Sequence, residues 1–148
     1  MRTAAVFTVA AVLSLPALLA GCGGGGDSGN AEFATAAEAA CTSARGQIAA
    51  LGTPEPDTLV KYLQSTDSIV ARMRAKLGRI KGQGTAEKAY AEGLAIASKA
   101  LGEMVLAAQG QNFDSVGEIS ERLAKVRLGE LAEEAGLESC AKVLKVKS

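Results

Sequence analysis

The sequence predicts an all-α fold, an antiparallel four-helix bundle over residues 31–141. From Ala31 onward, apolar residues recur at spacings of three and four, which is the period of an amphipathic helix. No long segment alternates apolar and polar residues with the period of two that is typical of strands. Short segments rich in Gly or Pro separate four such stretches, and short connections favour antiparallel neighbours.

The first predicted helix covers residues 31–51, and the prolines at 54 and 56 place the start of the second near residues 53–57. The second helix is about 24 residues, or roughly 36 Å, long and ends at the Gly-containing segment 81–84. The apolar stripe of the first helix contains Phe33, Ala37, Ala40, Cys41, Ala44, Ile48 and Leu51. That of the second contains Leu59, Leu63, Thr66, Val70, Met73, Leu77 and Ile80.

The third predicted helix begins at Thr85, whose side chain can cap it, and ends at Gly110. Glu87 in its first turn is favoured by the helix dipole. Its apolar stripe contains Tyr90, Leu94, Ala97, Leu101, Met104, Val105 and Ala108.

The fourth predicted helix is capped by Asn112 or Asp114 and ends at Gly136, after which Leu137 folds back as an apolar contact. Its apolar stripe contains Val116, Ile119, Leu123, Val126 and Leu131. Residues 142–148 form a loose basic tail, which either contacts anionic lipids through its lysines or stays solvated; these are Lys142, Lys145 and Lys147.

Four glycines lie inside the predicted helices, and each costs about 1 kcal/mol relative to Ala. They are Gly93, Gly102, Gly117 and Gly129. Drift in a Gly- and Ala-rich proteome is the favoured explanation. Close approach of neighbouring helices is the alternative.

Residues 1–21 have the features of an export signal: one basic residue, Arg2, precedes an uncharged apolar run. The segment that follows, Leu19-Ala20-Gly21-Cys22, resembles the lipobox of bacterial lipoproteins. The resemblance implies a diacylglyceryl group on the sulfur of Cys22, cleavage before Cys22 and fatty acylation of the new amino group. The alternatives are an ordinary secretory signal and an uncleaved anchor helix, but the leader is short for a membrane span.

With that resemblance, the chain divides into a signal peptide (1–21), a lipidated Cys22 with a Gly-rich linker (22–30), a helical domain (31–141) and the basic tail (142–148). The linker has an expected span of roughly 14–17 Å, so it tethers the domain close to the lipid headgroups. The expected location is therefore the extracytoplasmic face of the cell membrane, held by the lipid at Cys22.

Two cysteines, Cys41 and Cys140, remain once Cys22 carries a lipid. An even pair in an exported protein predicts a disulfide, which would close a loop of 99 positions. The chain-entropy argument gives such a loop ~4.7 kcal/mol of stabilisation. Two free thiols are the alternative.

The domain also resembles a loose group of small exported bacterial proteins of unknown function, over residues 31–141. The most specific shared segment ends in Gly-Leu-x-x-Cys and corresponds to residues 135–140. Other shared features are Cys41, Tyr90, the Pro-containing segment 53–56 and the segment 107–110. The resemblance implies a helical, disulfide-closed domain and supplies no activity. Where the group places Pro between the second and third helices, this chain has Gly82 and Gly84.

The composition argues against several functional classes. Sixteen Lys and Arg balance sixteen Asp and Glu, so the basic surface needed for nucleic-acid binding is missing. The chain has no His, which removes the commonest general base and metal ligand. Aromatic residues make up 3% of the chain and Trp is absent, so stacking platforms are scarce.

Three features with possible chemistry have simpler structural explanations. Ser98 with Lys99, and Ser65, are candidates for a nucleophile of the Ser–Lys type, but serines on a helix face are more simply explained as solvated. The segment 82–85 can hold an anion at a helix start, but it lacks the Walker pattern and is more simply a cap. Four carboxylates at the end of the fourth helix suit a solvated acidic end, because bundle metal sites add His; they are Glu130, Glu133, Glu134 and Glu138.

We therefore expect a membrane-anchored lipoprotein of the bacterial cell envelope that acts as a non-enzymatic interaction or structural module. Its partners would be the membrane and an unknown envelope protein, and no cofactor is expected. The alternative is a lipoprotein that binds a small ligand in a cavity between helices. Adaptable residues for such a cavity are Tyr62, Met73, Tyr90 and Met104, although their helical spacing favours a place in the core.

Overall fold

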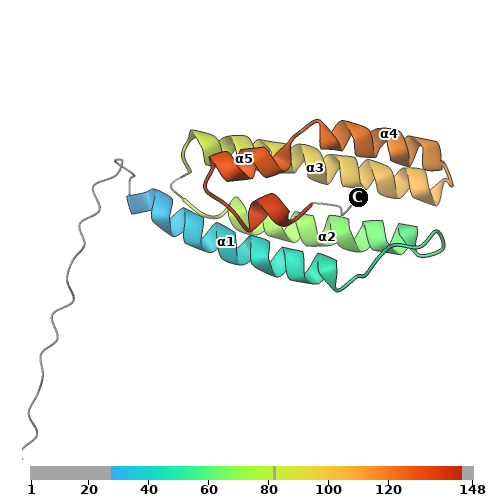
Figure 1. Cartoon of the computed structure of the whole chain (residues 1–148), viewed down its shortest axis with the longest axis horizontal. Helices are drawn as coiled ribbons and strands as arrows, with labels where there is room; N and C mark the ends of the chain where they lie inside the picture. The colour runs from blue at the N-terminus through green and yellow to red at the C-terminus, as the bar shows by residue number, and fades with distance from the viewer. Residues whose placement is uncertain (1–27, 82, 145–148) are drawn as a thin grey trace, which may run out of the picture.

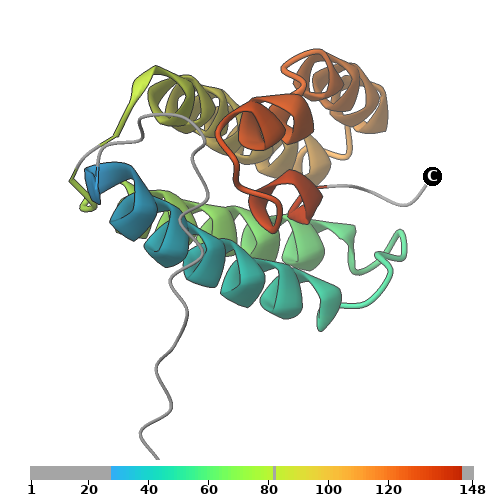
Figure 2. The same cartoon turned by 60° about the vertical axis from the view of Figure 1, so that its left-hand side comes forward.

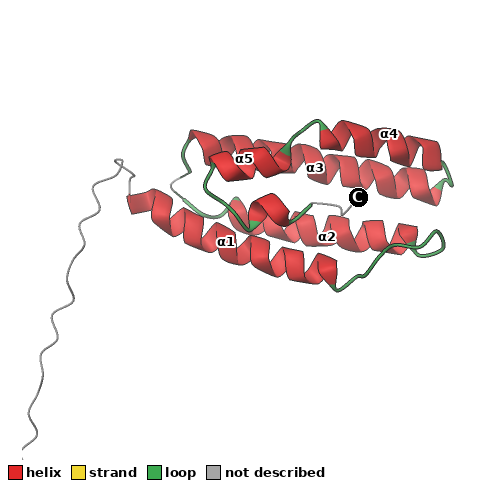
Figure 3. Ribbon diagram, in the orientation of Figure 1, coloured by secondary structure: helices red, strands yellow, loops and turns green. Residues whose placement is uncertain are grey.

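The structure is a computed structural model that describes residues 28–81 and 83–144. These residues form helices and connecting segments with no strand (Figure 3), which confirms the all-α prediction. The helices are α1 (Ser28–Ala49), α2 (Leu59–Leu77), α3 (Thr85–Gln109), α4 (Phe113–Ala124), α5 (Leu128–Glu134) and the 3₁₀ helix η1 (Cys140–Lys142). The predicted signal peptide, Cys22, Lys145 and Lys147 lie outside the described residues.

The helices lie in two groups, with α1 and α2 in one and α3, α4 and α5 in the other (Figures 1 and 2). The 3₁₀ helix η1 lies between the two groups, where it contacts both α1 and α5. Helix α3 is the centre of the arrangement, because it packs against α2, α4 and α5. The core therefore forms where α1, α2, α3 and η1 meet.

The predicted apolar stripes supply most of this core. In α1 the buried residues are Phe33, Ala37, Ala40, Cys41 and Ala44, and helix formation starts earlier than predicted, at Ser28. In α2, Ile69 joins the predicted stripe, and the helix has 19 residues rather than about 24 because it ends at Leu77. The buried residues of α3 include Tyr90, Leu94, Leu101 and Met104, as predicted.

The fourth predicted helix is wrong as a single element, because the chain turns between α4 and α5. Arg127 adopts a left-handed backbone conformation (φ 53°), and the backbone N–H of Arg127 bonds the Ala124 carbonyl oxygen at 3.2 Å. A non-glycine residue in this region ends regular helix geometry. The turn displaces α5 from α4, and α5 packs on the N-terminal half of α3 (Figure 1).

Two predicted helix ends are confirmed. The Asn112 side chain accepts a hydrogen bond from the Ser115 backbone N–H at 3.2 Å, so Asn112 caps α4. At the end of α5, Gly136 has a φ of 69° and the Leu137 N–H bonds the Ala132 carbonyl oxygen at 2.8 Å. This is the pattern of a Schellman motif, and Leu137 is completely buried as its apolar contact.

Of the two predicted ends of α3, the start is wrong and the C-cap is confirmed. Gly84, not Thr85, is the N-cap of α3, since Thr85 already lies within the helix. At the other end, Gly110 is the C-cap, as predicted, and Gln111, which follows it, is left-handed (φ 57°). The Asn112 N–H then bonds the Ala107 carbonyl oxygen at 2.9 Å, which closes the α3 C-terminus.

The predicted loose tail begins in an ordered part of the fold. Lys142 belongs to η1 and is exposed, whereas Val143 is buried and Leu144 is half-buried. Both apolar residues pack against the core. The C-terminal segment from Leu137 to Leu144 is therefore part of the domain.

Candidate functional site: the disulfide and the adjoining pocket

The predicted disulfide between Cys41 and Cys140 is present, with the two Cα atoms 4.9 Å apart. Cys41 lies in the middle of α1 and Cys140 begins η1, so the bond joins the first helix to the C-terminal segment. Exposed fractions of 0% for Cys41 and 4% for Cys140 place the bond inside the core. The Schellman turn at Gly136 directs the chain back toward α1, which brings Cys140 into reach.

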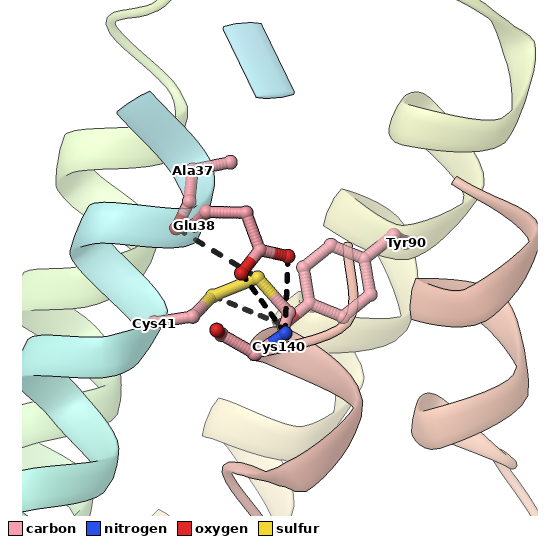
Figure 4. The surroundings of a disulfide bond; sticks show 6 residues. Ala37, Glu38, Cys41, Tyr90 and Cys140 are labelled. Atoms are coloured by element: carbon pink, nitrogen blue, oxygen red, sulfur yellow. Dashed lines mark hydrogen bonds between the residues drawn. A yellow bond between two sulfur atoms is a disulfide. The ribbon is translucent and has the colours of Figure 1, made fainter. Parts of the chain in front are cut away.

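A second link between the same two elements lies beside the disulfide (Figure 4). The Ser139 backbone N–H donates to both carboxylate oxygens of Glu38, each at 3.0 Å. The sulfur of Cys140 contacts the Ala37 carbonyl oxygen at 3.8 Å, which is not a hydrogen bond because a disulfide sulfur carries no hydrogen. The segment before η1 is thus fixed to α1 by a covalent bond and by one charged acceptor.

Tyr90 of α3 approaches the disulfide from the opposite side (Figure 4). Its hydroxyl oxygen lies 3.9 Å from the sulfur of Cys41, and only the hydroxyl can donate. Burial, with a smaller contribution from the Glu38 carboxylate, raises the pKa of Tyr90 well above its ordinary value. Tyr90 is therefore a neutral phenol at physiological pH and contributes packing rather than a base.

A pocket of about 350 Å³ lies next to the disulfide, among α3, α4, α5 and η1. This volume is within the range of small-ligand sites. Tyr90 and Cys140 line it on the disulfide side, and Ser120 and Arg127 add polar groups. Its apolar walls are formed by Met73, Leu94, Leu123, Leu128, Val143 and Leu144.

Gly93 of α3 lies against α5 and the segment before it, next to the part of the chain that lines the pocket. A Cβ atom at Gly93 would lie 2.8 Å from Leu131 Cδ1 and 3.5 Å from Val126 Cγ1. Gly93 is buried, so its missing side chain allows α5 to approach α3 closely. Drift is therefore the wrong explanation for Gly93, whereas at Gly102 and Gly117 a Cβ atom would meet nothing within 4 Å.

The structure separates the four adaptable residues that the sequence singled out. Met73 and Tyr90 both line the pocket. Met104 is buried in the core of α3 and is not a lining residue of this pocket, and Tyr62 is half-buried on α2. Half of the set is thus brought together.

The acidic residues at the end of the fourth predicted helix are solvated, as expected. Glu133, Glu134 and Glu138 are exposed, and Glu130 is paired with Arg127. No group of three or more acidic or sulfur-containing residues suited to a metal ion occurs in residues 28–81 and 83–144. In the segment 83–85, for which a helix cap was the simpler explanation, the Gln83 side chain donates to the carbonyl oxygens of Leu77 (3.0 Å) and Ile80 (3.4 Å) and so caps the end of α2.

The serine and lysine residues considered for a Ser–Lys pair lie on helix faces rather than together in a buried site. Ser98 and Ser65 are half-buried on helices α3 and α2, and Lys99 is exposed. The residues that sequence reasoning missed are Glu38 and Arg127, whereas for Gly93 close helix approach was the less favoured of two explanations. In the sequence, Glu38 and Arg127 look like ordinary solvated charges. Only the folded chain brings Glu38 to Ser139 and Arg127 to the pocket.

Several large apolar side chains remain exposed. Leu106 (69% exposed) and Phe113 (52%) flank the turn between α3 and α4, and Leu51 (37%) follows α1. Both connecting segments lie at the end of the molecule opposite to the start of α1 (Figure 1). Ile96 (56%) is separate, in the middle of α3.

No family model, curated protein or solved structure matches this chain. Among the described helices, none combines the length and the apolar composition needed to cross a bilayer.

Proposed function

We propose that this chain is a lipoprotein of the bacterial cell envelope, lipidated at Cys22, and that its helical domain is a non-enzymatic interaction or structural module on the extracytoplasmic face of the membrane. The observation that carries the exported location is the buried disulfide between Cys41 and Cys140. Disulfides persist in oxidising compartments outside the cytoplasm and are rare within it. The lipobox-like segment that ends at Cys22 supports the anchor.

The exposed apolar residues support an interaction role. The predicted linker joins the domain at the start of α1. The exposed side chains of Leu51, Leu106 and Phe113 belong to segments at the opposite end of the domain. A 22-residue helix is about 33 Å long, so a tether at one end presents the other end away from the membrane. Contiguous exposed apolar patches are typical of interaction sites, and a patch formed by these side chains would serve as one.

The anchor is tested by labelling cells with a radioactive fatty acid. Wild-type protein should carry label and Cys22→Ser should not, while the same label on both variants would overturn the lipid anchor. Fractionation of the cells then reports whether unlabelled protein has left the membrane.

The interaction role is tested by photo-crosslinking from the α3–α4 turn in intact cells. A crosslinker at Asp114, which is exposed in the first turn of α4, should capture one discrete envelope protein, and Leu106→Ser with Phe113→Ser should abolish that product. Ile96→Ser is the matched control, because Ile96 is equally exposed but lies elsewhere on α3. Equal crosslinking by all three proteins would contradict the assignment.

We also infer that the helices form an antiparallel four-helix bundle in which α4 and α5 together take the place of the fourth helix. Support comes from the packing of consecutive helices, since α2 contacts α1 and α3, and α3 contacts α4 and α5. Distances between spin labels on exposed positions of α1 and α3 test this arrangement in solution.

The second candidate function is binding of a small ligand, and the observation that favours it is the 350 Å³ pocket beside the disulfide. In this case the envelope protein would be a carrier or sensor of that ligand. The walls are mainly apolar with a few polar groups, which is typical of ligand sites.

A further inference from the structure

We propose that the pocket among α3, α4, α5 and η1 binds a single linear acyl chain with an anionic end group, such as a medium-chain fatty acid, with its carboxylate at Arg127. This inference rests on the second candidate function and adds the chemical class of the ligand. The chain would lie against the leucines and valine of the pocket, and the head group would remain at the rim.

The apolar walls and the volume define the tail of the ligand. The lining side chains of Leu94, Leu123, Leu128, Val143 and Leu144 provide only hydrocarbon contacts, and Met73 adapts its shape to an occupant. A volume of 350 Å³ corresponds to about a dozen non-hydrogen atoms, at ~30 Å³ for one water in the liquid. One chain of eight to ten carbons is therefore the expected size, whereas a two-chain lipid is too large.

The charge of the rim defines the head group. Arg127 is the cation among the described lining residues, and that set contains no carboxylate. Its side chain is 69% exposed, and its guanidinium is a planar fork of donors that suits a carboxylate. Ser120 lines the same pocket and adds a hydroxyl group.

The guanidinium already binds one carboxylate, which supports the same chemistry. Arg127 Nε donates to Glu130 Oε1 at 2.7 Å, and Glu130 is itself 51% exposed. An exposed pair of this kind is weak, so a ligand carboxylate can share or replace Glu130 at little cost. The competition limits affinity, and we expect a dissociation constant between tens of micromolar and about a millimolar.

Two of the three methionines, Met73 and Met104, provide an internal control for the experiment. The full chain, reconstituted in lipid nanodiscs and labelled with ¹³C at the methionine methyl groups, is titrated with decanoate and with decylammonium. Decanoate should shift the Met73 methyl resonance saturably and leave that of Met104 in place, because only Met73 lines the pocket. Decylammonium, which has the same tail and the opposite charge, should bind roughly 10-fold more weakly.

Matched arginine variants test the head-group contact. Arg127→Gln should weaken decanoate binding roughly 5- to 10-fold and remove the preference over decylammonium. Gln is compatible with this backbone, since Gln111 adopts the same left-handed conformation in this fold. Arg122→Gln is the control and should bind as wild type, because Arg122 is also exposed and paired, with Glu103, but does not line this pocket.

A third variant, Ala124→Trp, places a large side chain at an exposed position of the pocket wall and should block binding. If it fails to fold, the arginine pair still decides the test. A Met73 resonance that decanoate does not move would overturn this inference, whereas the second candidate function would fail only if small ligands of other classes also left that resonance in place. Equal binding of the two amphiphiles, or equal effects of Arg127→Gln and Arg122→Gln, would overturn only the anionic head group.

Discussion

Both carboxylate oxygens of Glu38 lie 3.0 Å from the backbone nitrogen of Ser139, 101 positions further along the chain. The acceptor belongs to α1 and the donor precedes η1, so this bond and the disulfide hold the same two elements together. Ser139 is half-buried. Without Glu38 its N–H would lose hydrogen bonds to water on folding and gain no protein acceptor in their place.

Glu38→Ala should therefore lower the free energy of unfolding by about 1–3 kcal/mol, the cost of leaving such a donor unpaired. Glu38→Gln keeps one acceptor oxygen and should cost less. Glu32→Ala is the matched control on the same helix, because Glu32 is exposed. Urea unfolding of the four proteins measures the effect, and equal midpoints for Glu38→Ala and Glu32→Ala would contradict it.

Replacement of both Cys41 and Cys140 by Ala should lower stability by up to ~4.7 kcal/mol, because the disulfide closes a loop of 99 positions. That is a large part of the ~5–15 kcal/mol that stabilises a small domain. Unfolding in urea with and without a reducing agent checks this. Wild-type protein in reductant should match the double variant, and a midpoint that reductant leaves unchanged would show that the bond contributes little.

The features that the sequence predicted correctly are those set by local chemistry. The period of three to four identified the buried faces of α1, α2 and α3, and the Gly136–Leu137 pair identified the end of α5. The break at Arg127 was missed because its signal is absent: no Gly or Pro stands there, and the apolar period continues through it. Tertiary packing of α5 on α3 overrides the local pattern.

The site was less predictable than the fold. The disulfide followed from the number of cysteines, but the pocket arises from the offset between α4 and α5 and from the return of η1. Gly93 illustrates the limit of the sequence. Positions 93 and 102 are both glycines inside the same predicted helix, and only the contact of Gly93 with Leu131 in the fold distinguishes them.

Substitution of the two glycines by Ala should separate these roles. Gly102→Ala should stabilise the protein by about 0.5–1 kcal/mol, since the new methyl group meets open space and Ala favours the helix. Gly93→Ala gains the same helix preference but forces the Leu131 side chain to move, so it should be about 1–3 kcal/mol less stable than Gly102→Ala. Thermal unfolding by circular dichroism measures both, and equal shifts would mean that α5 adjusts freely.

Tyr90 makes the domain sensitive to alkaline pH. Its pKa is raised in the folded state by burial first and by Glu38 second, so the folded chain keeps the phenol proton that the unfolded chain loses. Stability from this group is complete below the unfolded pKa of about 10 and falls as pH rises above it, because the unfolded state then binds fewer protons. Tyr90→Phe should remove this fall.

The Tyr62→Phe variant allows the ionisation of Tyr90 to be measured directly. The chain has two tyrosines, and this variant keeps only Tyr90. Its tyrosinate absorbance should appear only at a pH well above 10, together with loss of the helical signal. In urea the same absorbance should appear near pH 10, which sets the unfolded reference. Ionisation near pH 10 in the folded variant would show that the phenol reaches solvent, and the disulfide beside it would then be accessible too.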